Sequence, residues 1–315
     1  LVHVLRQGVE VFLGDLFYGW AQGRRGQALE ILEAWYGREV ARRFFDYPDS
    51  ESFIEGTRVA SPMTEWLCAL AKGVITHSRW GVNRVARSCS GPIFVVPLAY
   101  DAVPDESGDH YGQNQDAFRL LTVGQVNTNK RAASVIEAIS GSDILRDRVT
   151  YQLVGRIEPK MAQALSVRAA ESRVKLIIAG EVGQDELIRA FAQADAVSCL
   201  RWPSLEAASA SAIEALLHGK ATLVTDTGFY REIPDDCVLK IDPNNEVEAI
   251  RTALVRLTGD AGFRQSLSVA GQGWARQTFT AENYSNALVR MVESLRKAEP
   301  VLAMAEHCAA LMEGW

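Results

Sequence analysis

From residue 119 onward, short apolar runs alternate with segments of helical length, and this alternation constrains the fold more than any other feature. The runs are RLLTVG (119–124), VTYQLVG (149–155), VKLIIAG (174–180), AVSCL (196–200), ATLVTD (221–226) and CVLKID (237–242). Because they are largely apolar throughout, they predict strands buried on both faces. Such strands separated by helices predict a doubly wound parallel α/β sheet, whose ligands lie beyond the carboxyl ends of the strands.

Helical spacing fills the gaps between these runs. The predicted helices between strands are Lys130–Ile139, Met161–Glu171, Asp185–Gln193 and Ala207–His218. After residue 245 the predicted helices are Glu246–Leu257, Gly262–Ala270 and Ala281–Lys297, followed by an amphipathic piece at 301–313.

The first hundred residues carry a weaker pattern. Residues 1–72 have helical apolar spacing without a clear strand, and the runs Gly73–Thr76 and Ile93–Pro97 then predict one β-α-β unit. The chain begins at Leu1 inside a helix-like pattern, so we expect a truncated start. The expected organisation is a partial amino-terminal domain at 1–103, a polar linker at 104–117, the main sheet domain at 118–284 and carboxy-terminal helices at 285–315.

Composition narrows the class of protein. With 315 residues, 48% hydrophobic, the chain favours two domains, since a single core stops growing at roughly 250–300 residues. The net charge of −6 argues against a nucleic-acid partner. Five dispersed cysteines, without a CxxC pair, predict reduced thiols in a cytoplasmic protein and no zinc site. We find no P-loop and no apolar run long enough to span a membrane.

The first candidate site lies in LRWPSLEAASASAIEALLHGK, residues 200–220. We predict a helix that Glu206 opens, with Ser204 as its cap, and that runs to about His218. The first-turn amides, which would have no intrahelical acceptor, are assigned to Ala207, Ala208 and Ser209. Such a helix end carries roughly half a positive charge and binds phosphate without a metal.

The same segment contains two carboxylates eight residues apart, Glu206 and Glu214. On one helix they would lie about two turns, roughly 12 Å, apart. One carboxylate would meet the sugar of a sugar nucleotide and the other its ribose hydroxyls. An ordinary alanine-rich helix with two solvated glutamates accounts for the pattern equally well.

The second candidate site is LLTVGQVNTNKR, residues 120–131. A buried strand ends at Gly124, and Lys130 stands where the next helix begins, so that its amine can reach a phosphate at the strand ends. The alternative is a solvated first-turn lysine. The order of strands in a doubly wound sheet can bring this loop and the Glu206 loop to one crevice, which favours a functional role.

These segments resemble the donor domain of glycosyltransferase family 4. The resemblance is carried by TVGQVNTNKR, by YQLVGRIEP and by the stretch from LIIAG (176–180) to REIPDD (231–236). It covers roughly residues 70–290 and is most specific at 119–243. It implies a GT-B fold with two Rossmann-like domains, the amino-terminal one incomplete here. It also implies sugar transfer with retention of anomeric configuration.

The resemblance assigns roles to individual residues. It implies that Glu206 and Glu214 form the E-x7-E motif, the first near the donor-sugar hydroxyls and the second on the ribose. It implies that Lys130 contacts the donor diphosphate. The remaining implied donor-binding residues are Gly124, Gln125, Val182 in the GEVG loop near the nucleobase, and Ala207, Ala208 and Ser209.

The chain departs from the family pattern at three of these positions. Gln125 stands where many members carry an arginine, and Ala207 and Ser209 stand where glycines are usual. A degenerate or accessory module that binds nucleotide sugars without turnover is therefore the alternative function. A nucleotide-sugar 2-epimerase is a third hypothesis, although more histidines and acids would be expected in its cleft loops.

The leading hypothesis is a retaining glycosyltransferase that moves a hexose from a nucleotide-diphosphate sugar to a hydroxyl of a glycan, lipid or small-molecule acceptor. Lys130 and Glu206 would be its catalytic residues, and no cofactor or metal would be required. We expect it in the cytoplasm. The segment Arg38–Phe45 mixes arginines with aromatics, which suggests either weak contact with the inner face of a membrane or, preferably, a half-buried amphipathic helix. His77 either faces the cleft or serves as a satisfied cap.

Overall fold

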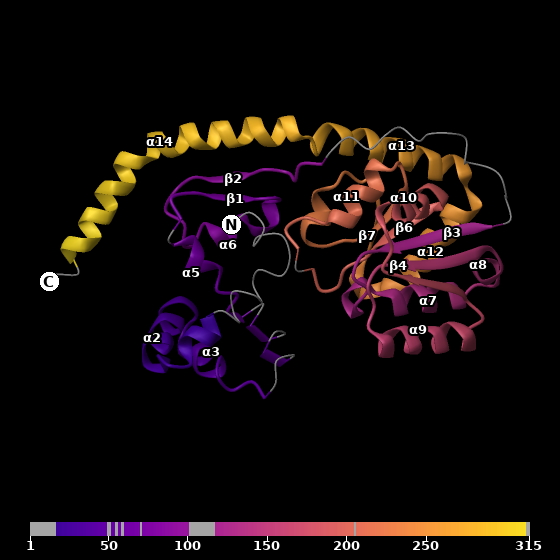
Figure 1. Cartoon of the computed structure of the whole chain (residues 1–315), viewed down its shortest axis with the longest axis horizontal. Helices are drawn as coiled ribbons and strands as arrows, with labels where there is room; N and C mark the ends of the chain where they lie inside the picture. Colours follow the sequence, from indigo (N-terminus) through magenta and orange to yellow (C-terminus); the bar gives the residue numbers. More distant parts are fainter. Residues whose placement is uncertain are drawn as a thin grey trace. The chain divides into compact units, whose positions relative to one another are not determined.

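The computed structural model describes residues 17–48, 52–53, 56–57, 60–69, 71–100, 117–204 and 206–312 (Figure 1). The chain divides into two compact units. The first comprises Leu1–Leu98, Leu205–Ala208 and Glu282–Trp315, and the second Ala99–Ser204 and Ser209–Ala281. The predicted linker at 104–117 lies almost wholly outside the described residues. Among the described residues, no helix is long and apolar enough to cross a membrane.

The second unit is built on one six-stranded sheet. Its strands are β3 (Phe118–Val123), β4 (Val149–Val154), β5 (Lys175–Gly180), β6 (Ala196–Cys199), β7 (Ala221–Thr225) and β8 (Leu239–Ile241). The strand order is β5-β4-β3-β6-β7-β8, and every neighbouring pair is parallel. All six predicted strands are confirmed. The order reverses between β3 and β6, which makes the carboxyl ends of these two strands the switch point of the sheet.

Helices cover both faces of this sheet, as a doubly wound fold requires (Figure 1). They are α7 (Ala132–Ser140), α8 (Asp143–Arg148), α9 (Pro159–Glu171), α10 (Gln184–Gln193), α11 (Ala210–Leu217), α12 (Glu246–Gly259) and α13 (Ala261–Thr278). Helix α12 packs on α7 and α8, and α9 packs on α7. On the opposite face, α11 packs on α13 and on β6 and β7.

Aliphatic side chains from the strands make the core of the second unit. Leu120, Leu223 and Tyr151 are fully buried, and all residues of β7 are buried. Each leucine removed from water in this way contributes about 1.5–3 kcal/mol relative to an exposed one. Strand β5 departs most from the predicted burial on both faces. It pairs only with β4, so its residues alternate between exposed and half-buried.

The helices differ from the predictions at four places, one of which is α13, which ends at Thr278 and not at the predicted Ala270. Helix α11 begins at Ala210, four residues after Glu206. The structure also adds α8, whose amino end is capped by Ser142 Oγ accepting from the Leu145 N–H at 3.4 Å. At the carboxyl end, α14 runs without interruption over Ala281–Met312, with Pro300 inside it. A proline removes one helical hydrogen bond and can kink a helix without ending it, and Figure 1 draws α14 as one helix that changes direction.

The described residues of the first unit form two small cores. Its elements are α2 (Arg25–Tyr36), α3 (Arg38–Arg43), α5 (Thr64–Cys68), β1 (Val74–Thr76), the 3-10 helix η1 (Arg79–Gly81), α6 (Val82–Val85), β2 (Ile93–Val95) and most of α14. Strands β1 and β2 are parallel, which confirms the predicted β-α-β unit. Below residue 70, buried rings form an aromatic cluster around Phe17, Phe44 and Phe53.

Candidate functional site

Three glycines end the strands on one side of the switch point. Gly124, Gly155 and Gly180 follow or end β3, β4 and β5, and all three have positive φ, at 92°, 136° and 74°. A side chain on Gly155 would overlap the carbonyl oxygen of Gly124, and one on Gly124 would come within 3.2 Å of Lys130 Nζ. Glycine is therefore required where the backbone turns away from the sheet and leaves room beside Lys130.

Lys130 lies at the carboxyl end of β3, as its position in the sequence predicts. It is the last residue of the 3-10 helix η2 (Thr128–Lys130), two residues before α7 begins. Its side chain is only 4% exposed, and its Nζ donates a hydrogen bond to the carbonyl oxygen of Val123, the last residue of β3. The structure therefore rules out a solvated first-turn lysine and places a buried ammonium group at the switch point.

The neighbouring cation is held by a carboxylate. Arg131 donates from Nε to both carboxylate oxygens of Glu246, at 2.9 Å each, and from Nη2 to one of them at 2.7 Å. Glu246 is buried, and this hydrogen bonding raises the pKa of the Arg131 guanidinium. Of the two adjacent basic residues, Arg131 forms a structural ion pair between the start of α7 and the start of α12, whereas Lys130 stays at the strand end.

The loops that follow β3 and β6 are hydrogen-bonded to each other. The Trp202 N–H donates to the Asn129 carbonyl oxygen at 3.0 Å, and Asn129 Nδ2 donates to the Pro203 carbonyl oxygen at 2.8 Å. Asn129 directly precedes Lys130 in the sequence. The prediction that a doubly wound sheet brings these two loops together is therefore confirmed for the part of the second loop that ends at Pro203.

Sequence reasoning missed Arg201, which lies two residues after the end of β6 at Cys199. Arg201 is 7% exposed. Its main-chain N–H donates to Thr225 Oγ1 at 2.9 Å, and its Nη1 donates to the Leu200 carbonyl oxygen at 2.9 Å. The signal available in the sequence was a basic residue directly after the apolar run that predicts this strand, LR at 200–201.

The amino end of α11 differs from its prediction. Ser209, and not Ser204, is the residue that precedes the helix, and its backbone is extended (φ −114°, ψ 109°). The Ile213 N–H donates to the Ser209 carbonyl oxygen at 3.0 Å, so the first-turn amides belong to Ala210, Ser211 and Ala212. Assigning these amides to Ala207, Ala208 and Ser209 was wrong. Both candidate caps are serines and the Ser209 side chain makes no capping hydrogen bond, so residue preference at the cap does not distinguish the two starts.

This shift separates the two glutamates of the E-x7-E spacing. Glu214 lies half-buried within α11, but Glu206 lies before the helix, so the predicted 12 Å separation along one helix does not hold. Glu206, Ala207 and Ala208 belong to the first compact unit, whereas Ser209 and Glu214 belong to the second. The roles assigned to these residues stay predictions.

The other predicted donor-binding residues lie in loops after the strands. Gln125 is exposed directly after Gly124. Val182 is half-buried in the loop between Gly180, at the end of β5, and Gln184, where α10 begins. Because β5 is an edge strand two positions from the switch point, a ligand that contacts both Lys130 and Val182 would extend across the ends of three strands.

His77 and the basic aromatic segment favour structural roles. His77 is 4% exposed, and its Nδ1 lies 2.9 Å from the Val96 carbonyl oxygen, to which it donates. In the segment at 38–45, Phe44 is 1% exposed and packs against Phe17 and Phe53 with ring centroids 5.6 and 5.2 Å away. The half-buried amphipathic helix is therefore the better interpretation of α3.

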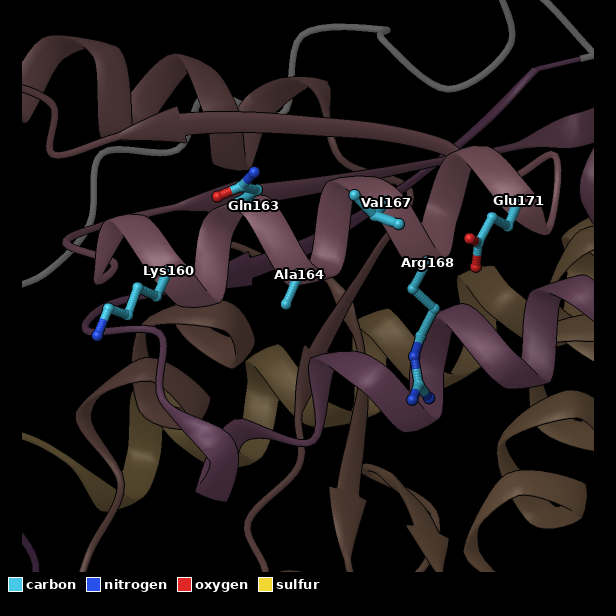
Figure 2. A pocket seen from close by; sticks show the side chains of 6 residues that line it. All are labelled: Lys160, Gln163, Ala164, Val167, Arg168 and Glu171. Atoms are coloured by element: carbon cyan, nitrogen blue, oxygen red, sulfur yellow. The ribbon is translucent and has the colours of Figure 1, made fainter.

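A surface hollow of about 470 Å³ lies away from these loops. It is lined by Lys160, Gln163, Ala164, Val167, Arg168 and Glu171, and Figure 2 shows that all six side chains stand on α9. Arg168 Nη1 lies 3.7 Å from Oε2 of Glu137, a residue of α7. No strand end contributes to this hollow, so it does not compete with the switch point as a ligand site. Within the described residues there is no group of three histidine, cysteine, aspartate or glutamate side chains that could hold a metal ion.

The sequence matches a known family over the whole sheet domain. The profile described as "Glycosyl transferases group 1" matches residues 105–274, more than half of the chain. The chain belongs to the group 1 glycosyl transferases. No curated protein matches the sequence significantly.

Solved structures of several other proteins share the fold. Sucrose-phosphate synthase from Thermosynechococcus elongatus matches with a TM-score of 0.62 and 18% identity, over 79% of this chain and 63% of its own. A glycosyltransferase from Rickettsia africae matches with a TM-score of 0.63 and 15% identity, over 76% of this chain and 68% of its own. HepE from Anabaena, solved with UDP and glucose, matches with a TM-score of 0.59 and 16% identity, over 73% of this chain and 66% of its own.

These likenesses confirm the predicted fold class, which is α/β of GT-B type with a Rossmann-like carboxy-terminal domain. This group 1 glycosyl transferase spans 63% of the length of the synthase that it resembles. An incomplete amino-terminal domain, and membership of family 4 in particular, stay predictions.

Proposed function

We propose that this chain transfers a hexose from a nucleotide-diphosphate sugar to an acceptor hydroxyl, with retention of anomeric configuration and without a metal. The observation that carries the proposal is the buried Lys130 amine at the end of β3, on the switch point of the sheet. Open α/β sheets bind their ligands at this place. Membership of the group 1 glycosyl transferases supports the class of reaction.

The chemistry asks the protein to stabilise a leaving diphosphate. The bond between the sugar C1 and the β-phosphate oxygen breaks, and the acceptor oxygen bonds to C1 on the same face of the sugar. The acceptor's proton passes to the leaving diphosphate or to water. Negative charge therefore develops on the phosphate oxygen, and a positioned ammonium group lowers the energy of that transition state.

The first turn of α11 supplies a second source of positive potential. The amides of Ala210, Ser211 and Ala212 have no acceptor within the helix, and α11 follows the strand β6 on the switch point. Their small side chains allow a phosphate group to approach the backbone closely. Together with Lys130, this helix end supports diphosphate binding without a divalent cation.

Glu206 and Glu214 complete the proposed donor site, on sugar and ribose hydroxyls respectively, with Gly124, Gln125 and Val182 as further contacts. HepE, which shares the fold, was solved with UDP and glucose, and this favours a uridine nucleotide and a hexose as the first donor to test. The proposed acceptor is a glycan, lipid or small molecule. We propose a cytoplasmic site of action, with at most weak peripheral contact with a membrane.

The test is donor binding followed by turnover. UDP-glucose and GDP-mannose are titrated by calorimetry, and release of the nucleoside diphosphate is then measured for the donor that binds. We expect Lys130→Met to lower the rate of release by about 10²–10³-fold, the usual cost of removing one group that stabilises developing negative charge. Lys160→Met, on the exposed face of α9, is the matched control and should keep the wild-type rate.

The outcomes separate the proposal from its alternative. Equal rates for wild type, Lys130→Met and Glu206→Ala would show that the assigned site is wrong. Donor binding with no release of nucleoside diphosphate would favour the accessory module. Gln125 is exposed directly after Gly124 and supplies no cation there, and this observation motivates testing the alternative.

A further inference from the structure

The surface of helix α9 carries four exposed side chains in a regular row. Lys160, Ala164, Val167 and Glu171 follow one another at intervals of four, three and four residues. At 3.6 residues per turn, this spacing places them along one side of the helix, which we call the outer stripe of α9. The buried residues of α9 lie on the opposite side and pack into the core of the second unit. The outer stripe is therefore a continuous face turned toward solvent.

The outer stripe ends in charges of opposite sign. Lys160 stands in the first turn of α9 and Glu171 is its last residue, and Figure 2 shows them at opposite ends of the helix. In the part of the chain that the structure describes, neither side chain makes an ion pair or a hydrogen bond with another residue. Arg168, which flanks the stripe, differs because its Nη1 lies 3.7 Å from Oε2 of Glu137. Both end charges are therefore available to a partner.

The middle of the outer stripe is apolar and uneven. Val167 is 50% exposed, whereas Ala164, one turn earlier, has only a methyl group. A single exposed valine is ordinary on a protein surface. Here, however, the valine lines the surface hollow of about 470 Å³ together with the alanine. A protruding side chain next to a small one can interlock with the same pair on a second helix.

A second α9 that runs in the opposite direction matches the stripe at every position. The pair Lys160 and Glu171 and the pair Ala164 and Val167 are both centred between residues 165 and 166. One two-fold axis at that level therefore sets Lys160 of each copy opposite Glu171 of the other, and Ala164 opposite Val167, so that each contact occurs twice. A parallel pair would place lysine against lysine and glutamate against glutamate. The charges thus favour the antiparallel arrangement.

We propose that the outer stripe of α9 is the contact surface of a symmetric dimer, in which two copies of this chain pack their α9 helices antiparallel. The inference is independent of the proposed function, because α9 packs on the edge strand β5, two positions from the switch point of the sheet. A single pair of helices buries less than the roughly 800 Å² per partner of a standard interface. The dimer is therefore weak and reversible, with a dissociation constant of about 10 µM to 1 mM.

The test measures the mass of the whole chain in solution by sedimentation equilibrium, at concentrations from about 1 µM to about 1 mM. We expect the mass of the wild-type chain to rise from one copy toward two. Lys160→Glu and Glu171→Lys each place like charges at both ends of the interface, and each should raise the dissociation constant by about 10–100-fold.

A second substitution tests the apolar centre of the stripe. Val167→Glu puts two carboxylates close to the two-fold axis, and it should raise the dissociation constant by at least about 10-fold. Val269→Glu, which replaces a valine that is 59% exposed on α13, is the matched control and should leave the dissociation constant unchanged.

Mixing the two charge variants tests the antiparallel arrangement directly. The stripe of Lys160→Glu is negative at both ends, and that of Glu171→Lys is positive at both ends. An equimolar mixture can therefore form a mixed dimer that is attractive at both ends, although neither variant pairs well with itself. We expect its dissociation constant to lie within about threefold of the wild-type value. The double variant, which exchanges the two charges within one chain, should recover to the same extent. Circular dichroism and the melting temperature establish that each variant is folded.

Three results would overturn the inference. One is a wild-type chain that stays monomeric at about 1 mM, which would leave the outer stripe to solvent or to a different protein. Another is a dimer that none of the α9 substitutions weakens, which would place the contact on another surface, such as the exposed apolar side chains Val289, Val301 and Met304 of α14. The last is a mixture of the two charge variants that stays monomeric, which would show that Lys160 and Glu171 do not face each other across the two-fold axis.

Discussion

The two compact units have cores of different composition: aliphatic side chains on a parallel sheet in the second, and packed aromatic rings in the first. In the second unit, aliphatic side chains project from a parallel sheet into helices on both faces, and fully buried Leu120 and Leu223 are typical of its core. In the first unit, rings from α2, α3 and their flanking residues pack against one another, as in the edge-to-face contacts of Phe44 with Phe17 and Phe53. No strand occurs among the described residues below 70.

The difference has a consequence for function. A parallel sheet brings the carboxyl ends of distant segments to one edge, so Asn129 and Pro203, 74 residues apart, meet there. The packed rings below residue 70 stabilise a core but define no such edge. Consistent with this, the two buried cations at strand ends, Lys130 and Arg201, both belong to the second unit.

The largest expected effect tests whether the aromatic cluster is an independent core. Phe44→Ala removes a ring that is 1% exposed and should lower the free energy of unfolding of the first unit by about 3–5 kcal/mol. Hydrogen exchange read by mass spectrometry should show faster exchange at 17–48, with protection kept at 117–204. Phe44→Leu, which keeps most of the volume, should lose less than half as much. Equal loss of protection in both units would break the comparison, because it would show one cooperative core.

A pair of glycine substitutions tests the strand ends of the second unit. Gly155→Ala places a methyl group against the Gly124 carbonyl oxygen at a φ of 136°, and we expect a loss of about 3 kcal/mol in the free energy of unfolding. Gly183→Ala adds a methyl group in open space at a φ of −72°, so the change should stay within about 0.5 kcal/mol. Urea denaturation measures both. Similar losses in the free energy of unfolding for the two variants would mean that the close approach of the backbones after β3 and β4 does not restrict position 155 to glycine.

The smallest expected effect concerns one buried thiol in each unit. Burial raises the pKa of Cys68 and of Cys237 from 9 to about 11, with Cys89 and Asp236 respectively adding to the rise. Because the folded pKa lies above the unfolded one, these thiols stabilise the fold fully below pH 9, and this contribution is lost as the pH rises through about 11. Alkylation at pH 8 should therefore modify the exposed Cys308 first.

A Cys308→Ser variant should then react slowly with the same reagent up to pH 9. Above that pH, mass spectrometry of the digested protein shows whether Cys68 or Cys237 is modified first. The order shows which of the two units unfolds more readily at alkaline pH. Rapid reaction of Cys237 at pH 8 would contradict the tight packing of the second unit.

The strand positions were predictable because burial along a strand depends on the chemistry of consecutive residues. The prediction failed where a neighbour in space mattered. Strand β5 is as apolar as the others, yet its Ile177 is exposed, whereas Ile241 of the other edge strand, β8, is buried. The start of α11 was misplaced because the backbone is still extended at Ser209, and local helix propensity did not indicate this.

The sequence by itself determined the fold class, the six strands and the basic residue at the end of the first of them, since apolar periodicity and glycine positions are properties of short segments. The tertiary structure alone decided which cations stay at the strand ends. Arg131 is held by Glu246, 115 residues away, while Lys130 and Arg201 meet the carboxyl ends of adjacent strands. Contacts between distant segments depend on the order of strands in the sheet, and that order forms only when the whole core is buried.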